Sequence, residues 1–234
     1  MIPRRRFRPV HLLREATQSA LHKRLSGAPT SGMRTDFTCH GQPVIFLHNP
    51  KTGGNSLGTL LGVKRLSHTW ASERLSPQSW HSHFSIVVVR DPFERFLSGY
   101  FSHILRPDMN GLVKHYGPQI KSISPSDYLS VLAANPKYGG HQTLWTDYPS
   151  VTKPRADLVL KLEASHTWDT ALEAAGIDMK GRRLTHDNKS ARGAVDPQAH
   201  LKLSDRAFDD LRGDVARYFR HDYTTFGYPI PKVA

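Results

Sequence analysis

The residues best suited to chemistry lie in one short loop, Asn49 to Ser56, which reads NPKTGGNS and is called the glycine loop below. An apolar run at 44–47 precedes it and leucines at helical spacing follow it, a pattern that predicts strand, tight loop and helix. The adjacent glycines Gly53 and Gly54 let backbone N–H groups approach a ligand closely, and Lys51 adds positive charge. We expect a phosphate or sulfate to bind here.

Two other interpretations of this loop were weighed. A Gly-Gly pair between a strand and a helix also occurs in plain turns, so the pattern alone leaves that alternative open. A Walker A loop requires its lysine after the glycines, whereas Lys51 precedes both Gly53 and Gly54. An ordinary ATPase or GTPase is therefore disfavoured.

A second candidate anion site follows the next predicted strand. The run FSIVVV predicts a strand buried on both faces, and Arg90 stands at its carboxyl end, where open α/β sheets bind ligands. Asp91 can cap and Pro92 can open the next helix, which carries Ser98 about two turns further on. A lone strand-end arginine is more often a surface ion-pair partner. Together with the glycine loop, Arg90 and Ser98 instead favour a ligand with two separate anionic groups.

The elements that position these residues predict an α/β fold. Two successive strand-to-helix units with parallel strands require crossover connections, so we expect a single domain with a mostly parallel central sheet flanked by helices. The length of 234 residues suits one domain of this kind. The remaining patterns predict a turn at Ser76-Pro77, a helix starting at Ser124-Pro125, a strand at 157–163, a helix from Ser165 to Gly176, and a last helix capped by Ser204.

The composition points to anionic partners. Lys and Arg total 32 against 20 Asp and Glu, which gives a net charge of +12 and a pI near 10.0. We expect no nucleic-acid partner, because no interleaved aromatic and basic pattern of an RNA-recognition module occurs. The single cysteine, Cys39, excludes an internal disulfide and a cysteine-based zinc cluster.

The first 40 residues are expected to form a basic, partly flexible N-terminal extension, with the folded domain over 41–234. Four arginines give this extension its charge: Arg4, Arg5, Arg6 and Arg8. They form either a solvated arm, which we favour, or a polyanion contact. No apolar run reaches the length of a bilayer-spanning helix or a secretory h-region. We therefore expect a cytoplasmic enzyme or one released into solution.

At this point the motifs resemble a known family. The stretches PVIFLHNPKTGGNSL and SIVVVRDPFERFLSGYF are similar to two motifs of the sulfotransferases that use 3′-phosphoadenosine-5′-phosphosulfate (PAPS), in particular the carbohydrate (family 2-like) branch. The similarity continues through SHTWASERLSPQSWHSHFS, DLVLKLEASHTWDTALEAAGI, HDNKSAR and YFRHDYTTFGYP, and so covers Pro43 to Pro229. It implies a P-loop-like sulfotransferase fold and transfer of a sulfuryl group from PAPS to a carbohydrate hydroxyl, with 3′-phosphoadenosine-5′-phosphate (PAP) released.

The resemblance also implies roles for individual residues. It puts six residues around the 5′-phosphosulfate: Lys51, Thr52, Gly53, Gly54, Asn55 and Ser56. It puts Arg90 and Ser98 on the 3′-phosphate, and His68, between the two motifs, as the catalytic base. The chain departs from the family where Asn49 replaces the usual Ile and Asn55 the frequent Thr, which leaves the hydrogen bonding of the glycine loop open.

The chemistry implied is an in-line displacement at sulfur. Lys51 and the loop N–H groups would neutralise the departing phosphate, and His68 would accept the proton of the acceptor hydroxyl, because an imidazole with a pKa of about 6.5 is largely neutral at pH 7. Without the family, His68 is one of fourteen histidines and resembles an ordinary surface residue. Glu73 is the reserve base. This scheme requires no metal.

Several alternatives stay open. The same chemistry on a small-molecule or lipid-linked acceptor is one, and a non-catalytic basic module that binds polyanions is another; the second would bind with steep salt dependence and ignore PAPS. Five loop residues either join the site or are simply solvated: His141, Gln142, Asn188, Lys189 and Arg192. The positive charge is compatible with an acidic acceptor.

Overall fold

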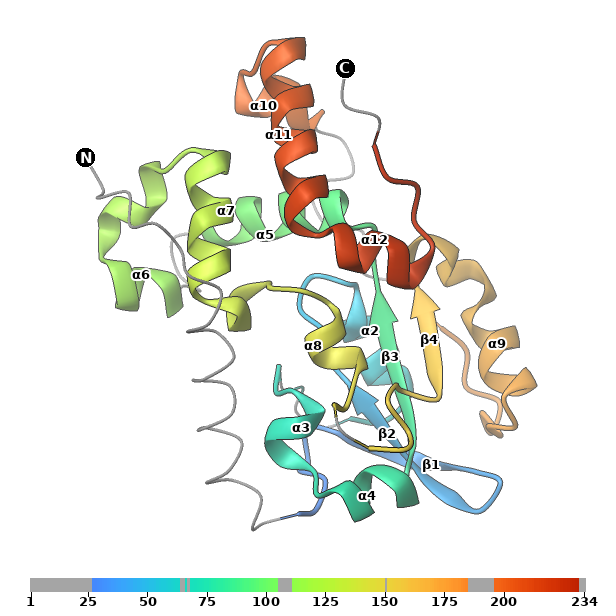
Figure 1. Cartoon of the computed structure of the whole chain (residues 1–234). Helices are drawn as coiled ribbons and strands as arrows, with labels where there is room; N and C mark the ends of the chain where they lie inside the picture. The colour runs from blue at the N-terminus through green and yellow to red at the C-terminus, as the bar shows by residue number, and fades with distance from the viewer. Residues whose placement is uncertain are drawn as a thin grey trace.

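The computed structural model describes residues 27–63, 66, 68–104, 111–149, 151–184 and 196–231. In these residues four strands form one sheet in the order β1-β2-β3-β4 (Figure 1). They are β1 (Arg34–Cys39), β2 (Gln42–Leu47), β3 (Phe84–Val89) and β4 (Leu158–Lys161). β1 and β2 are antiparallel, whereas β2, β3 and β4 run parallel. The expected α/β fold with a mostly parallel sheet is thereby confirmed.

Helices surround the sheet. The α-helices are α2 (Gly54–Leu60), α3 (Ala71–Arg74), α4 (Pro77–Ser82), α5 (Pro92–Ile104), α6 (Gly111–Tyr116), α7 (Pro125–Ala134), α8 (Thr143–Thr146), α9 (Trp168–Ala174), α10 (Pro197–Leu201), α11 (Asp205–Tyr218) and α12 (Arg220–Phe226). Short 3-10 helices span Pro118–Ser122, Pro136–Tyr138 and Leu162–Thr167. In the described part of the chain, no helix has both the length and the apolar character needed to cross a bilayer.

The alternation of side chains along the strands divides the core into two layers. Val44 and Phe46 point to the face covered by α2 and α9, where they pack with Leu57 and Leu172. Ile45, Leu47 and Val87 point to the opposite face, where three tryptophans cover them: Trp70, which caps α3, Trp80 of α4 and Trp145 of α8. β3 is buried on both faces, as its run of β-branched residues predicts.

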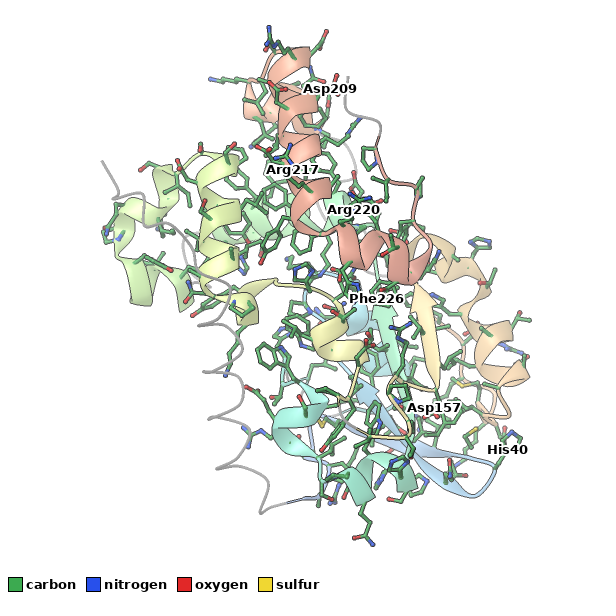
Figure 2. All side chains as sticks on the ribbon, viewed as in Figure 1. His40, Asp157, Asp209, Arg217, Arg220 and Phe226 are labelled. Carbon is green, nitrogen blue, oxygen red and sulfur yellow. The ribbon has the colours of Figure 1, made fainter. Side chains whose placement is uncertain are left out.

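A third cluster of apolar side chains lies beyond the carboxyl end of the sheet. It joins α5, α7, α11 and α12 through residues such as Phe96, Tyr128, Val215 and Tyr223. Figure 2 gives the direction: His40, in the β1–β2 turn, lies at one end of the molecule, and Phe226 of α12 lies near the other end of the strands. This helical cluster therefore stands over the edge of the sheet at which parallel strands usually bind ligands.

Local sequence signals define several helix starts correctly. Asp91 Oδ1 accepts hydrogen bonds from the backbone N–H groups of Phe93 and Glu94, both at 2.9 Å, and Pro92 opens α5. Ser124 Oγ caps α7 by accepting from the N–H of Asp127 at 3.1 Å. These bonds connect neighbours in sequence, so their residue types alone predict them.

Other expectations need correction. Ser76 and Pro77 start helix α4 instead of a plain turn, because Ser76 Oγ caps the N–H of Ser79 at 3.1 Å. The helix expected from Ser165 begins at Trp168, after a 3-10 segment in which Ala164 leaves helical geometry. Gly176 follows its end with φ +87°, as expected.

The ends of the domain also differ from the expectation. Strand β1 lies within the segment assigned to an N-terminal extension, so the sheet begins before residue 41. Ser204 caps α11 as expected, with its Oγ accepting from the N–H of Ala207 at 3.3 Å, but α12 follows it. The four N-terminal arginines lie outside the described residues.

We expect Leu172→Ala to destabilise the fold by about 2–5 kcal/mol, because Leu172 is fully buried against the sheet and its truncation leaves a cavity. Thr170→Ala, on an exposed position of the same helix α9, is the matched control and should change stability by less than about 0.5 kcal/mol. Urea denaturation measures both. Similar losses for the two variants would contradict the core assignment.

Candidate active site

The backbone of the glycine loop tolerates no side chain at Gly53 or Gly54. Gly53 has φ +72°, and a Cβ there would lie 2.5 Å from Cδ1 of Leu162. A Cβ on Gly54 would lie 2.5 Å from Cδ2 of His48. Lys51 also takes a left-handed conformation, with φ +67°, at a cost of about 1 kcal/mol or more. The loop is therefore tightly specified.

The start of α2 is suited to an anion. Gly53 is the N-cap and provides no side chain to accept from the first N–H groups, and the first turn carries no acidic residue. Thr52 is buried and uses its hydroxyl locally, donating to the carbonyl of Asn49 at 2.8 Å. Asn55 is exposed and Ser56 is half-buried.

The two strand-to-helix connections, the glycine loop after β2 and the segment around Arg90 after β3, are called the two corners below. Arg90 lies in the second corner, at the end of β3. Its Nη2 lies 3.1 Å from Oε2 of Glu94, one turn into α5, and its side chain is 21% exposed. Ser98 is half-buried one further turn along the same row of α5. Glu94 thus lies between Arg90 and Ser98 on this face of the helix.

The end of β4 and the C-terminal segment reinforce this corner. Glu163 accepts from the backbone N–H of Asp91 at 2.8 Å and from the hydroxyl of Tyr228 at 2.9 Å. The ammonium group of Lys161 lies 4.4 Å from the centre of the Tyr228 ring. Three segments distant in sequence therefore meet beside Arg90.

His68 lies next to the glycine loop. Its ring centroid is 4.3 Å from that of His48, and its Nδ1 lies 3.4 Å from the carbonyl oxygen of His48. Desolvation and the positive charges of Lys51 and Arg95 lower the pKa of His68, while the bond to the His48 carbonyl opposes this change. The structure thus brings His68 and Lys51 together.

Two further histidines border the same space, and the sequence interpretation missed both. Burial, with the nearby charges of His68 and Lys51, lowers the pKa of His48 to about 3. Burial, with the charges of Lys51 and His68, lowers the pKa of His103 to about 4. His103 Nδ1 lies 2.6 Å from the hydroxyl of Tyr128. The sequence did hold one signal for His103: it lies three residues after Tyr100, on the buried apolar face of α5, which indicates a buried imidazole.

A buried arginine, Arg95 of α5, holds the glycine loop through hydrogen bonds. Arg95 is 3% exposed; its Nε donates to the carbonyl of Pro50 at 3.0 Å and its Nη2 to Oδ1 of Asn49 at 3.0 Å. Its Nη1 donates to the carbonyl of Gly140 at 2.8 Å. Burial lowers the pKa of Arg95 to about 10, opposed by the charge of Asp222. Arg95 therefore stays protonated at neutral pH, and its charge lies under the loop.

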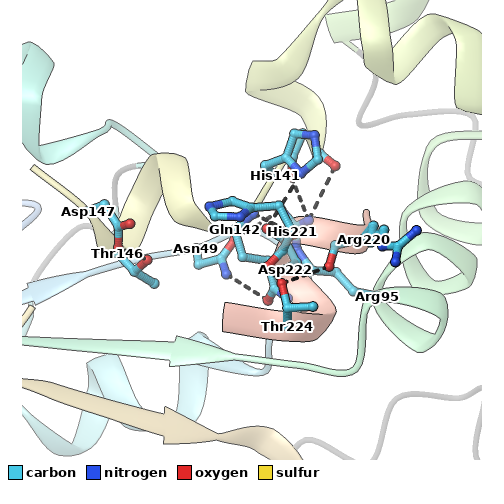
Figure 3. A network of polar contacts seen from close by, with 12 residues as sticks. Asn49, Arg95, His141, Gln142, Thr146, Asp147, Arg220, His221, Asp222 and Thr224 are labelled. Atoms are coloured by element: carbon cyan, nitrogen blue, oxygen red, sulfur yellow. Dashed lines mark hydrogen bonds and ion pairs between the residues drawn. The ribbon is translucent and has the colours of Figure 1, made fainter. Parts of the chain in front are cut away.

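Gln142 connects this arginine network to the backbone of Arg90, and Figure 3 shows it with Asn49, Arg95 and Asp222. Its Oε1 accepts from Asn49 Nδ2 at 3.1 Å and from the Arg90 N–H at 2.9 Å, and its Nε2 donates to the Arg90 carbonyl at 2.7 Å. Asp222 of α12 accepts from the N–H of Gln142 at 2.8 Å. Gln142 is fully buried, so it is part of the framework and not a solvated loop residue.

The other open residues have varied positions. His141 stacks on Tyr218 at 5.0 Å, and its Nδ1 lies 3.5 Å from Oδ1 of Asp222. Glu73, the reserve base, lies on α3 and pairs with Lys137 at 3.1 Å. Asn188, Lys189 and Arg192 lie outside the described residues. Among the residues that are described, no group of three or more potential ligands could hold a metal ion.

The buried histidines predict a stability that falls in mild acid. Because the pKa of His48 is lower in the folded than in the unfolded state, the unfolded chain binds more protons below pH 6.5, and the free energy of unfolding drops as the pH falls towards 4. His48→Phe should make this slope shallower by up to about 1.4 kcal/mol per pH unit. Denaturant titrations from pH 4.5 to 7.5 measure it, with exposed His166→Gln as control. A wild-type slope in His48→Phe would contradict the assignment.

Comparison with known proteins adds one finding. A family model described as the sulfotransferase family matches residues 37–138, the segment that contains the glycine loop, His68, and the Arg90 and Ser98 corner. Neither the curated proteins nor the solved structures include a match to the chain. The resemblance expected from the two motifs is thus confirmed: over residues 37–138 the chain matches the sulfotransferase family.

Proposed function

We propose that this protein is a sulfotransferase that moves the sulfuryl group of PAPS to a hydroxyl group of a carbohydrate acceptor. One observation carries the proposal: within the segment that matches the family, a positively charged glycine loop adjoins an imidazole whose pKa is lowered. Sulfuryl transfer needs both parts, a site for the anionic donor and a neutral base for the acceptor hydroxyl.

The residues present fit a donor with two anionic ends. At one end, the start of α2 has no side-chain cap, Lys51 lies in the loop, and the buried Arg95 bonds the carbonyl of Pro50 in the same loop. At the other end, Arg90 offers a guanidinium group at the end of β3, and Ser98 lies on the helix α5 that follows. Bound PAPS would supply the sulfuryl group and leave as PAP.

The glycine loop and Arg90 would stabilise different charges of the donor. Lys51 would offset charge that develops on the 5′-phosphate, joined by the N–H groups of Thr52, Gly53, Gly54, Asn55 and Ser56. Arg90 would hold the 3′-phosphate by a charge-assisted hydrogen bond, which requires its guanidinium to exchange Glu94 for the ligand or to bind both.

His68 would act as the general base. If its Nδ1–H donates to the His48 carbonyl, the lone pair of Nε2 is left to accept the proton of the acceptor hydroxyl. Desolvation and the charges of Lys51 and Arg95 favour the neutral form that this role requires at pH 7. The acceptor would then lie on the exposed side of His68.

A transfer assay tests the function directly. We expect labelled PAPS to pass its sulfuryl group to at least one member of a panel of neutral and acidic oligosaccharides, with small alcohols and a lipid-linked sugar included. Product mass identifies the acceptor. Lys51→Ala should lower the rate by about 100-fold or more, because charge stabilisation is lost, whereas exposed Lys121→Ala should not. Salt-sensitive polyanion binding without PAPS binding would instead indicate a binding module.

His68→Ala tests the base. It should bind PAP in calorimetry within about threefold of the wild type but lose about 10²–10⁴ in kcat. The acid limb of the wild-type kcat/KM profile should lie below pH 6.5, since the pKa of His68 is lowered from that value. Glu73→Gln is the comparison. Unchanged kinetics in His68→Ala with a large loss in Glu73→Gln would transfer the role to Glu73.

A further inference from the structure

The side chains of Asn49 and Gln142 bond the edge of β3 beyond the point where β2 ends. β2 pairs with β3 as far as Leu47 opposite Val87, and β3 continues beyond that pair. On the stretch of β3 that β2 no longer pairs with, Asn49 Nδ2 donates to the carbonyl of Val88 at 3.1 Å. Gln142 then bonds both the N–H and the carbonyl of Arg90. The backbone that carries Arg90 is therefore held by side-chain amides where a neighbouring strand would otherwise hold it.

The same amides reach the glycine loop. Oε1 of Gln142 accepts from Asn49, which begins the loop, and Oδ1 of Asn49 accepts from Arg95. Arg95 in turn bonds the carbonyl of Pro50, one residue before Lys51. A continuous series of buried hydrogen bonds thus links the backbone at Arg90 with the backbone next to Lys51. Gln142 bonds to both sides of this series.

A residue of α12, which belongs to neither corner, also holds Gln142 in place. Its backbone N–H donates to Oδ2 of Asp222, a fully buried carboxylate on α12, at 2.8 Å. The oxygen of its side-chain amide accepts two hydrogen bonds, and the amide nitrogen donates one. A satisfied, fully buried amide has little freedom to change position, because breaking one bond would leave a buried group unpaired.

We propose that Gln142 is a positioning residue that fixes the separation of the two donor-binding corners. The inference rests on the proposed function, in which one nucleotide bridges Arg90 and the glycine loop. A ligand with both a 3′- and a 5′-anionic group depends on that separation, because its two ends must be bound at once. A ligand that uses only the glycine loop does not depend on it.

Two nucleotides and one double-mutant cycle test this role. Gln142→Met keeps the side-chain size but removes the amide. It should weaken PAP by about tenfold, or about 1.4 kcal/mol, and adenosine 5′-phosphosulfate, which lacks the 3′-phosphate, by less than about twofold. In an Arg90→Ala background, Gln142→Met should weaken PAP by less than about twofold more, because the group it positions is already absent. Calorimetry measures each affinity.

Controls separate positioning from general destabilisation. Ser85→Ala removes a buried hydroxyl that bonds Asp157 at the opposite end of β3, so it should lower stability without changing the ratio of the two affinities. Gln142→Asn keeps an amide but shortens the side chain by one methylene, so it cannot make the same bonds to both Arg90 and Asn49. It should give the same selective loss as Gln142→Met and replaces it if that variant does not fold.

The outcomes are distinct. Equal losses for PAP and adenosine 5′-phosphosulfate, or independent effects of Gln142→Met and Arg90→Ala, would overturn the positioning role while the proposed function stands. A wild-type protein that binds neither nucleotide would overturn the proposed function and this inference with it.

Discussion

The burial of the Arg95 guanidinium group constrains the whole region around the candidate site. A charge withdrawn from water is tolerated only when its N–H groups find acceptors, and here the acceptors are the carbonyls of Pro50, Gly139 and Gly140 and the amide oxygen of Asn49. These groups belong to two separate loops. Both loops must therefore adopt one conformation for Arg95 to be buried, and its burial in turn holds the glycine loop against α5.

This arrangement also distributes charge within the site. The fixed positive charge of Arg95 lies under the loop, where it favours an anion above and disfavours protonation of His68 beside it. Burial keeps His48 and His103 neutral as well, so the imidazoles do not add further positive charge near neutral pH. Cationic and neutral basic groups can thus stand side by side, a combination that acid-base chemistry next to an anionic ligand requires.

The layered fold brings these groups to one edge of the sheet. β2 and β3 run parallel, so the loops that follow them emerge side by side, and α5, α11 and α12 close the space above them (Figure 1). Because apolar layers cover both faces of the sheet, buried polar residues gather at the ends of its strands, and this end holds Asn49, Arg95 and Gln142. Asp222 on α12 is an example: it is fully buried, and its Oδ2 accepts a hydrogen bond from the backbone N–H of the loop residue Gln142.

The sequence by itself determined what depends on neighbours along the chain. The strand at 84–89, the caps Asp91 and Ser124, and the glycine loop follow from local periodicity and from residue types that satisfy nearby N–H groups. Only the tertiary structure decided that Asn49 meets Gln142, 93 residues away, and that Gln142 meets Asp222, 80 residues further on. Such pairs leave no periodic signal, because they form only once the sheet and helices have packed and buried polar groups must find partners wherever the fold places them.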